Sequence, residues 1–347
     1  MRNDINNKME KINDIRKPLA DRLPLEYPLS ISVTTSNVCN LKCEFCAISN
    51  KEHKRNKSFM EMDDFRLLID SIVDSGWHLK QLVLVGLGEP LLNKNIVKFV
   101  KLAKLSKHID KVHIVTNGTM LTHDVTDQLL EAGLDVLRVS INGLSDDDYI
   151  KYTGTKINFN DLVSNITYFY EQKSNQTKLY VKIMDYQIKG KECLFENTFS
   201  SISDVINIEY LTEMDTTMDY KKITNELSIK GLKGFEKVVT QICPLPFYHI
   251  YCNADATISA CCVAGPWYTP PALIIGDLHV VKLSEIWNGS AFNKFLISML
   301  TNGKEFANPI CKKCKAYLSY IYPEDTLDGK TEVIVNRMQK KMKELFL

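Results

Sequence analysis

The sequence predicts an α/β fold in which a partial (β/α)6 barrel of the TIM type is followed by a small cysteine-rich module. Short β-branched runs alternate with longer helical stretches from Leu29 onward, and this alternation is typical of repeated βα units. It stops near residue 215, and six of the ten cysteines lie beyond that point. The 347 residues exceed the usual domain size of roughly 100 to 200 residues, so a core with an appendage fits the length.

Six segments are expected to form the parallel strands of the barrel because they are mostly apolar, as strands covered on both faces are. They are residues 29–35, 81–86, 111–116, 135–141, 178–184 and 205–211. Residues 62–75 and 96–105 carry apolar side chains at helical spacing and predict two of the packing helices. In such a barrel, functional side chains gather in the loops that follow the carboxyl ends of the strands.

The chain divides into four predicted parts. They are an N-terminal extension of residues 1–28, the partial barrel of residues 29–215, the cysteine-rich module of residues 216–330 and a C-terminal helix of residues 331–347. The last helix combines apolar residues at helical spacing with four basic ones. We expect it to dock on the body of the protein, with membrane-surface binding as the less common alternative.

Composition and charge exclude several classes of protein. Apolar residues make up 45% and charged residues 24%, which excludes disorder and a fibrous repeat. Basic and acidic residues number 43 and 42, so the charge does not indicate binding to nucleic acid or to an anionic membrane. The uncharged stretch of residues 256–276 contains three prolines and is not expected to form a membrane-spanning helix.

The cysteines are expected to stay reduced. The first 28 residues lack the apolar segment and the cleavage site of a signal peptide, so we expect a cytoplasmic protein. In that compartment, clustered cysteines more often bind metal or take part in chemistry than form disulfides.

Three cysteines lie on one loop directly after the first predicted strand: Cys39, Cys43 and Cys46. A structural zinc site needs four ligands, whereas three thiolates leave one metal position open. Thiolates at such spacing hold iron–sulfur clusters, and a cubane with three protein ligands keeps one iron free for a substrate or cofactor. Buried packing of the three cysteines and an incomplete zinc ribbon are the alternatives.

The Cys-x3-Cys-x2-Cys spacing, with the aromatic Phe45 just before the third cysteine, resembles the signature of the radical S-adenosylmethionine (SAM) superfamily. The resemblance implies that a 4Fe–4S cluster on the three cysteines binds SAM through its open iron. It also implies that electron transfer cleaves SAM to methionine and a 5′-deoxyadenosyl radical, which abstracts hydrogen from an unactivated carbon. The cofactor supplies this chemistry, while the protein binds and orients the cofactor and the substrate and excludes water.

A second motif, Gly86-Leu87-Gly88-Glu89-Pro90, follows the second predicted strand and resembles the Gly-Gly-Glu-Pro loop of the same superfamily, with Leu87 as a departure. Glycine allows close backbone approach to a ligand, so Gly88 is expected to contact the cofactor. Glu89 is expected to accept a hydrogen bond from the methionyl ammonium group of SAM. For this motif on its own, a plain turn between strand and helix is the alternative.

Further candidates lie on the next strands. Relatives use the ends of the third and fourth strands to contact the methionyl carboxylate and the ribose, which implies cofactor binding by Asn117 and Ser140. Each segment is also a normal turn. Lys182, in the fifth strand, is expected either to face the barrel interior as an anion partner or to face solvent. His113, in the third strand, is expected to be a core residue whose polar atoms are satisfied.

A second group of cysteines lies in the predicted module. Its four members are enough to close a metal site: Cys243, Cys261, Cys311 and Cys314. Three segments between residues 253 and 288 resemble the cysteine-rich extension called SPASM, although Ala256 replaces the usual glycine and no cysteine follows Cys314. The resemblance implies the shortened twitch version with one auxiliary 4Fe–4S cluster. Structural zinc is the alternative, and Cys262 competes with Cys261 as a ligand.

The motifs together predict a radical SAM oxidoreductase. We expect hydrogen abstraction from a small-molecule substrate, in particular a sugar or aminosugar derivative, because the resemblance is strongest to enzymes of carbohydrate and aminosugar pathways. Loss of a proton, and of one electron to the auxiliary cluster, would complete a dehydrogenation. A flavodoxin- or ferredoxin-like protein is expected to supply the first electron.

Other functions stay open at this point. An epimerase would quench the substrate radical with a thiol hydrogen, for which Cys193, Cys252 and Cys262 are the candidates. A peptide-modifying enzyme and a nonenzymatic zinc or cysteine-rich binding protein are further alternatives. The candidate bases at strand ends are Asp185, Tyr186, Glu209, Glu213 and Asp215, and none of them is assigned a catalytic role.

Overall fold

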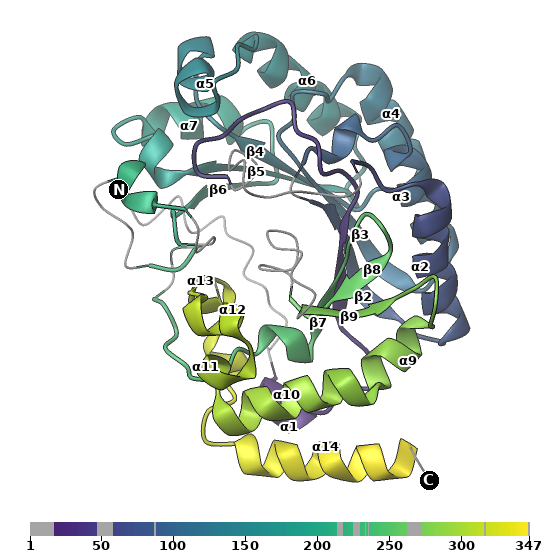
Figure 1. The fold of residues 1–347 in the computed structure, drawn as a ribbon. Helices are drawn as coiled ribbons and strands as arrows, with labels where there is room; N and C mark the ends of the chain where they lie inside the picture. Colours follow the sequence, from purple (N-terminus) through teal and green to yellow (C-terminus); the bar gives the residue numbers. More distant parts are fainter. Residues whose placement is uncertain are drawn as a thin grey trace.

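The computed structural model describes most of the chain. The described residues are 17–46, 58–86, 88–213, 218–224, 230–232, 234, 236–261, 273–315 and 317–345. Within them, one sheet of nine strands runs through the protein in the order β6-β5-β4-β3-β2-β1-β7-β8-β9. The sheet curves without closing, and helices surround its outer side (Figure 1).

Six parallel strands form the expected partial barrel. They are β1 (Ser30–Thr34), β2 (Leu79–Val85), β3 (Ile109–Thr116), β4 (Val136–Ile141), β5 (Lys178–Met184) and β6 (Val205–Glu209). Each strand pairs in parallel with the next one in the chain. All six strands predicted from the sequence are present, and their ends differ from the prediction by at most two residues.

Three more strands come from the cysteine-rich part of the chain. They are β7 (His249–Cys252), β8 (Thr257–Ser259) and β9 (Ile274–Asp277). β7 pairs in parallel with β1, with Ser30 opposite His249, and β8 and β9 follow in antiparallel order. The sequence did not predict this pairing, which makes the cysteine-rich part a continuation of the barrel sheet.

The turn between β7 and β8 explains one departure from the family pattern. Ala256 has a φ of 60°, a left-handed conformation that favours glycine. Alanine at the usual glycine position therefore keeps the same turn at the cost of some backbone strain.

The helices lie outside the curved sheet and below it. They are α1 (Leu19–Arg22), α2 (Met62–Asp74), α3 (Ile96–Leu105), α4 (His123–Glu131), α5 (Asp146–Thr153), α6 (Phe159–Gln172), α7 (Glu192–Phe199), α9 (Leu283–Asn288), α10 (Ser290–Asn302), α11 (Lys304–Ala307), α12 (Pro309–Lys313), α13 (Tyr317–Tyr320) and α14 (Thr331–Leu345). Short 3-10 helices are η3 (Pro90–Leu92), η4 (Asp185–Gln187), η5 (Tyr220–Lys222), η6 (Leu245–Phe247) and η8 (Pro323–Asp325). Helices α2 to α7 cover the outer face, and α10 and α14 lie side by side below the sheet (Figure 1).

Alternation along the strands gives the sheet two different faces. The outer face packs against the helices through residues that are at most 2% exposed, such as Ile31, Leu82, Ile114, Val139 and Ile183. The opposite face, which we call the inner face, carries polar side chains in register, among them Ser32, His113, Arg138, Ser140, Lys182, Asn207 and Glu209. The expectation of strands that are apolar on both faces is wrong for the inner face, because the helices cover only the outer one.

The C-terminal helix docks on the body of the protein, as expected. On α14, Ile334 and Met338 are buried. Arg337 Nη1 donates to the Ala20 carbonyl over 3.2 Å, and Lys341 Nζ donates to the Leu25 carbonyl over 3.0 Å. These contacts tie α14 to the N-terminal segment that contains α1.

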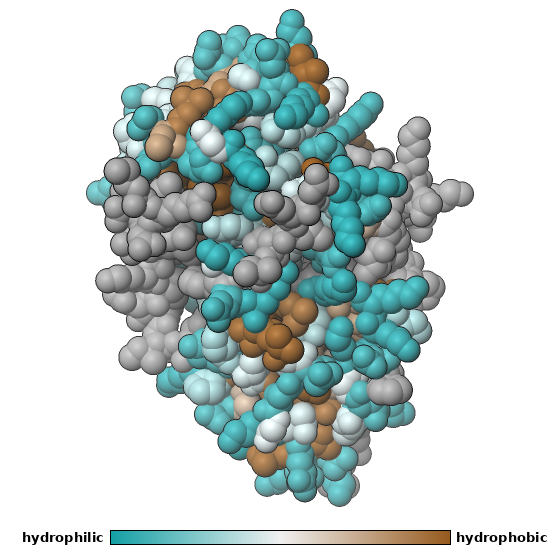
Figure 2. Space-filling model, turned by 90° about the vertical axis from the view of Figure 1, so that its left-hand side faces the viewer, coloured by the Kyte–Doolittle hydropathy of each residue, from teal (hydrophilic) through white to brown (hydrophobic). Residues whose placement is uncertain are grey.

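Among the described residues on the side drawn in Figure 2, hydrophobic side chains do not form one large area. Hydrophilic residues dominate that side, and hydrophobic residues form small, separate groups among them. In the part of the chain that the structure describes, no helix is both long and apolar enough to cross a membrane.

Candidate functional site

The loop with Cys39, Cys43 and Cys46 follows the carboxyl end of β1. Two backbone N–H groups of this loop donate to the carbonyls of Thr153 and Tyr152, at the end of α5, over 3.0 and 3.1 Å. A further bond from the Cys46 N–H to the Cys43 carbonyl closes a turn over 3.0 Å. The two bonds to Thr153 and Tyr152 fasten the cysteine loop to the end of α5.

The three thiols of this loop lie close enough to influence one another electrostatically. Burial raises the pKa of the Cys43 thiol well above its ordinary value, and the neighbouring Cys46 and Cys39 raise it further. Burial also raises the pKa of the Cys39 thiol. Because bound metal ions favour the thiolate form, an iron–sulfur cluster would remove this mutual repulsion, and the donor set fits a cluster with three protein ligands.

Gly88 lets the loop after β2 lie directly against the cysteine loop. The Gly88 N–H donates to the Ser36 carbonyl over 2.9 Å, and the Glu89 N–H donates to the Val38 carbonyl over 2.8 Å. A side chain at Gly88 would overlap the backbone of Val38, the residue before Cys39. The glycine is therefore required by this close approach, whether or not a cofactor also lies there.

Glu89 connects the ends of β2 and β3. It is 2% exposed, and its Oε1 accepts hydrogen bonds from the Leu91 N–H over 2.9 Å and from Thr116 Oγ1 over 2.5 Å. Its Oε2 accepts from the Asn117 N–H over 2.7 Å. Burial raises the pKa of this carboxyl, while the three donors oppose that shift. With both oxygens engaged, the geometry favours a positioning role, and the contact with a methionyl ammonium group stays a prediction.

Asn117 reaches the cysteine loop from the end of β3. Its Nδ2 donates to Asn40 Oδ1 over 2.9 Å and lies 3.8 Å from Cys39 Sγ. Phe45, on the same loop, packs edge-on against Tyr186, with ring centroids 6.3 Å apart. The structure thus brings the predicted residues Phe45, Glu89 and Asn117 together around the three cysteines.

Ser140 and Lys182 lie opposite each other on β4 and β5 of the inner face. Lys182 Nζ donates to Glu209 Oε2 over 2.6 Å, so the expectation that Lys182 faces the barrel interior is confirmed. Of the other candidate bases, Asp185 accepts the Leu211 N–H over 3.0 Å and Glu213 pairs with a lysine at the surface. Asp215 lies outside the described residues.

Two inner-face residues were missed or misjudged from the sequence. His113 is 6% exposed, and its Nε2 has no hydrogen-bond partner among the described residues, so the expectation of a satisfied core histidine is wrong. Arg138 Nε is likewise buried and without a partner in the same ranges. The available signal was the period of two: Arg138 precedes Ser140 by two residues and therefore shares its face.

The second group of cysteines also gathers at one place. Cys243 precedes η6, Cys261 follows β8, and Cys311 and Cys314 lie in α12 and at its end. Burial, followed by Cys261, Cys314 and Cys311, raises the pKa of the Cys243 thiol well above its ordinary value. Burial and the neighbouring thiols Cys261 and Cys314 raise the pKa of Cys311 to about 12. Four thiols that repel one another when ionised fit a fully ligated cluster.

The surroundings of this second group are partly cationic. Lys304 Nζ donates to the Cys314 carbonyl over 3.1 Å and lies 5.1 Å from the centre of the Tyr317 ring. The Tyr317 hydroxyl donates to the Thr240 carbonyl over 2.8 Å. Burial, with Cys243 and Cys314 nearby, raises the pKa of Tyr317.

The spacing of the thiols bears on the zinc alternative. Among the described residues, no group of three or more His, Cys, Asp or Glu side chains is arranged to hold a single metal ion. Thiolates around one zinc lie about 3.8 Å apart, given tetrahedral Zn–S bonds of about 2.3 Å. The ligands of a cubane bind different irons and therefore stand further apart than the ligands of one zinc ion.

The remaining cysteines lie away from the inner face. Cys252 is fully buried and opposite Val33, whose side chain belongs to the outer face. Cys193 is exposed on α7. Cys262 lies outside the described residues, so its competition with Cys261 is not resolved by the geometry.

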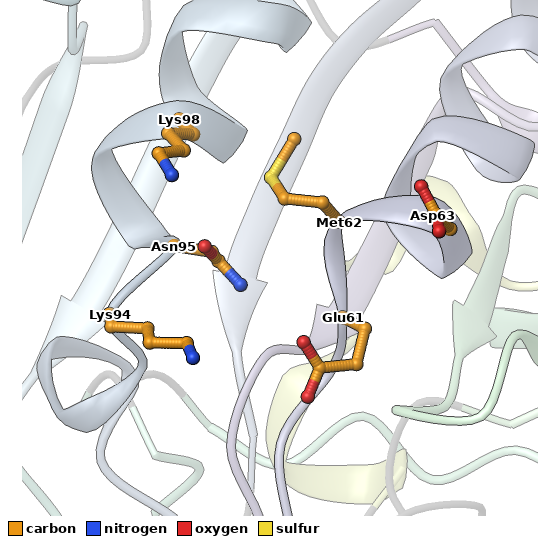
Figure 3. Close-up of a pocket in the computed structure, with 6 residues that line it drawn as sticks. All are labelled: Glu61, Met62, Asp63, Lys94, Asn95 and Lys98. Carbon is orange, nitrogen blue, oxygen red and sulfur yellow. The ribbon is translucent and has the colours of Figure 1, made fainter.

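A cavity of about 640 Å³ lies elsewhere, between the first turns of α2 and α3 (Figure 3). It is lined by Glu61, Met62, Asp63, Lys94, Asn95 and Lys98. Glu61 and Lys94 point toward each other across it, and none of the residues predicted for the site borders it (Figure 3). This cavity therefore carries neither of the two groups of thiols.

Two family models match the chain. The model of the Radical SAM superfamily matches residues 33–184, and the SPASM model, described as an iron–sulfur cluster-binding domain, matches residues 243–315. The first range contains the cysteine loop and the end of β2. The second contains the four cysteines of the second group.

The curated relatives share only part of their length with this chain. A GTP 3′,8-cyclase of Mannheimia succiniciproducens is 32% identical over 129 residues, which cover 37% of this chain and 36% of that protein. A GTP 3′,8-cyclase of Clostridium acetobutylicum is 32% identical over 184 residues, which cover 52% of this chain and 54% of that protein. The chain thus spans about half or less of the length of these two relatives.

Solved structures share the fold at low sequence identity. BtrN in complex with AdoMet and 2-DOIA has a TM-score of 0.54 and 18% identity, with 83% of this chain and 92% of that chain covered. Streptococcus suis SuiB bound to the precursor peptide SuiA has a TM-score of 0.57 and 14% identity, with 87% and 72% covered. Native anSMEcpe with bound AdoMet has a TM-score of 0.54 and 14% identity, with 91% of this chain and 96% of that chain covered.

Proposed function

Since the chain belongs to the radical SAM superfamily and carries a SPASM iron–sulfur cluster-binding domain, we propose that it dehydrogenates a small, polar, carbohydrate-like substrate. The two domains together imply SAM and two 4Fe–4S clusters as cofactors. The observation that carries the proposal is the gathering of the cysteines into two groups, with three thiols in the loop after β1 and four thiols around η6, β8 and α12.

The first site is assigned to the barrel. Cys39, Cys43 and Cys46 would hold the cluster whose open iron binds SAM, and this pair supplies the hydrogen-abstracting chemistry when bound. Gly88 keeps the loop after β2 against the cysteine loop, and Glu89 and Asn117 hold the ends of β2 and β3 beside it. From sequence, Ser140 remains our candidate for a ribose contact and Phe45 for a contact beside the cofactor.

The second site is assigned to the cysteine-rich part. The thiolates of Cys243, Cys261, Cys311 and Cys314 would hold the auxiliary cluster, which would supply an electron acceptor for the dehydrogenation. Four thiol ligands leave no iron of a cubane free, which supports an electron acceptor over a second substrate-binding cluster. Lys304 contributes a positive charge at this site, which favours acceptance of an electron.

The placement of two of the three candidate thiols supports dehydrogenation over epimerisation, and the third, Cys262, lies outside the described residues. Cys252 belongs to the outer face and Cys193 is exposed on α7, so neither is placed to donate hydrogen at the inner face. Peptide modification is the second candidate, because one structural neighbour, SuiB, was solved with a bound precursor peptide. We keep a flavodoxin- or ferredoxin-like electron donor and the reducing cytoplasm as parts of the proposal, because the clusters need reduced thiols.

An isotope experiment tests the proposal. Anaerobically reconstituted protein, SAM and reductant are combined with deuterium-labelled sugars, aminosugars and short peptides. We expect deuterium in 5′-deoxyadenosine with one of the sugar-like substrates, together with a product lighter by two hydrogens. Label transfer only from a peptide would contradict the carbohydrate-like substrate and favour peptide modification. A product of unchanged mass with inverted stereochemistry would contradict dehydrogenation and favour epimerisation.

A further inference from the structure

The inner face of β4 carries a guanidinium group without a polar partner in the described part of the chain. No hydrogen bond or ion pair joins Arg138 to any residue of the described ranges, and its Nε is buried. Its guanidinium lies over the ring of Tyr180, the residue opposite it on β5, at 5.3 Å from the ring centre. The contact fixes the direction of the planar group while its donors stay free.

A buried histidine stands beside this arginine. Val115, the inner-face residue that follows His113 on β3, lies opposite Arg138. His113 is 6% exposed, and its Nε2 has no partner among the described residues. Burial, followed by the charges of Arg138 and Lys111, lowers its pKa to about 3, so the ring is neutral near pH 7. A neutral imidazole adds hydrogen-bonding capacity beside the arginine without repelling it.

Buried polar atoms without partners are rare in folded proteins because each costs free energy. Here two such atoms lie near each other, Arg138 Nε and His113 Nε2, and the first belongs to a positively charged guanidinium group. This points to a ligand that forms the missing hydrogen bonds. The fork geometry of arginine matches the oxygens of phosphate and carboxylate groups. We propose that Arg138 and His113 bind an oxyanion group, phosphate or carboxylate, on the substrate; this inference rests on the proposed function.

The depth of the pair separates it from the cofactor. His113 lies three residues before the end of β3, and Arg138 lies three residues before the end of β4. Three strand residues correspond to about 10 Å. The cysteine loop follows the carboxyl end of β1, at the opposite end of this interval. The oxyanion group would therefore lie below the cofactor, on the inner face.

The neighbouring cation does not compete for this role. Lys182, on β5, is paired with Glu209 over 2.6 Å. Asn207, opposite Lys182 on β6, has a buried Oδ1 without a hydrogen-bond partner in the described ranges and offers a further polar contact for a hydroxyl group. The inner face thus combines an anion-binding end at β3 and β4 with a neutral polar end at β6.

Matched probes test the inference by equilibrium binding to the anaerobically reconstituted full chain. The probes are glucose, glucose 6-phosphate and glucuronate, which differ only in the charged group. We expect at least one charged probe to bind about ten-fold or more tightly than glucose. Arg138→Gln should remove that advantage, and Arg138→Lys should keep part of it because a point charge remains.

The control is Arg66→Gln, which removes an exposed arginine on α2 and should leave all three affinities unchanged. Protection of Arg138 from phenylglyoxal by the charged probe, followed by mass spectrometry with Arg66 as internal reference, gives a second readout on the wild-type chain. This protection measurement tests the oxyanion site even if Arg138→Gln does not fold. The phosphate and carboxylate probes distinguish the two sources of the oxyanion.

Three results would overturn the inference. They are equal binding of all probes by the wild-type chain up to about 10 mM, unchanged binding by Arg138→Gln, and loss of SAM affinity alone in that variant. Formation of 5′-deoxyadenosine by the wild-type chain without any probe is measured separately. Its absence would contradict the proposed function, while the probe affinities would still decide on the oxyanion site.

Discussion

Two buried polar side chains show how single residues divide between scaffold and site. Glu89 is almost fully buried, and its carboxylate accepts three hydrogen bonds, one from η3 and two from the end of β3 and the residue after it. His113 is buried to a similar degree, but its Nε2 has no partner among the described residues. A satisfied group stabilises the fold, whereas an unsatisfied one reduces its stability and is retained for another reason.

Glu89→Gln should destabilise the protein. A glutamine keeps the size but loses the charge, and its NH2 group would face backbone N–H donors that now lack an acceptor. We expect a loss of roughly 2–3 kcal/mol in the free energy of unfolding, measured by urea denaturation. Glu131→Gln, at an exposed position of α4, is the matched control. An equal loss in both variants would contradict the positioning role.

His113 should make stability depend on pH. Its pKa is about 3 in the folded chain, below the ordinary value of 6.5, so between these values the unfolded chain binds more protons. Stability is therefore fully present above pH 6.5 and is lost as the pH falls. From pH 7 to pH 5 we expect this residue to account for about 2 kcal/mol. The measurement compares wild type with His113→Phe, and parallel pH curves would contradict the expectation.

The sequence reveals the grouped cysteines more readily than the polar residues of the inner face. Cysteine spacing is written directly in the chain, so Cys39 and its two neighbours could be named at once. The partners of Arg138 and His113 depend on strand register and on which face the helices cover, and neither is visible in a single sequence. Glu89 was recognised as part of the site, but two of its three donors, Thr116 and Asn117, are brought to it only by the fold.

Among the elements, the loop after β2 lies directly against the cysteine loop. Gly88 and the Val38 backbone lie so near that no side chain fits between them. The backbone bonds on either side hold both loops in this arrangement. The arrangement of the first three thiols therefore depends on a strand that contributes no ligand.

Gly88→Ala should separate these loops. The added methyl group meets backbone atoms, which cannot move aside cheaply, so the cysteine loop must shift. We expect iron content to fall from about eight to about four per chain, with SAM binding lost and the second cluster kept. Gly76→Ala is the control: its φ of 65° brings strain, but no atom lies near the added group. Full iron content and SAM binding in Gly88→Ala would contradict this account.

Over the whole molecule, one sheet connects the part of the chain that carries the first group of thiols to the part that carries the second. β7 extends the barrel beyond β1, and β8 leads to Cys261, so the cysteine-rich part shares its backbone bonding with the barrel. The predicted order of six βα units is confirmed, whereas the pairing of β7 with β1 was not foreseen. β7 has only four residues, and nothing in so short a segment identifies its partner. The boundary at residue 215 stays a prediction.

The shared sheet should still allow the clusters to be removed one at a time. Cys311→Ser deletes one of four thiols in the second group, so we expect about four irons per chain instead of about eight, with SAM binding kept. Cys193→Ser, which changes an exposed cysteine of α7, should keep about eight irons per chain. Loss of all iron in Cys311→Ser would show that the two sites do not form independently.

The most direct measurement is cleavage of SAM by the anaerobically reconstituted chain with dithionite and no added substrate. We expect methionine and 5′-deoxyadenosine in equal amounts, and the loss of both products in the variant Cys43→Ser, because Cys46 and Cys39 both act electrostatically on the Cys43 thiol. Binding of SAM without any cleavage, or cleavage that persists in Cys43→Ser, would contradict the assignment of this loop.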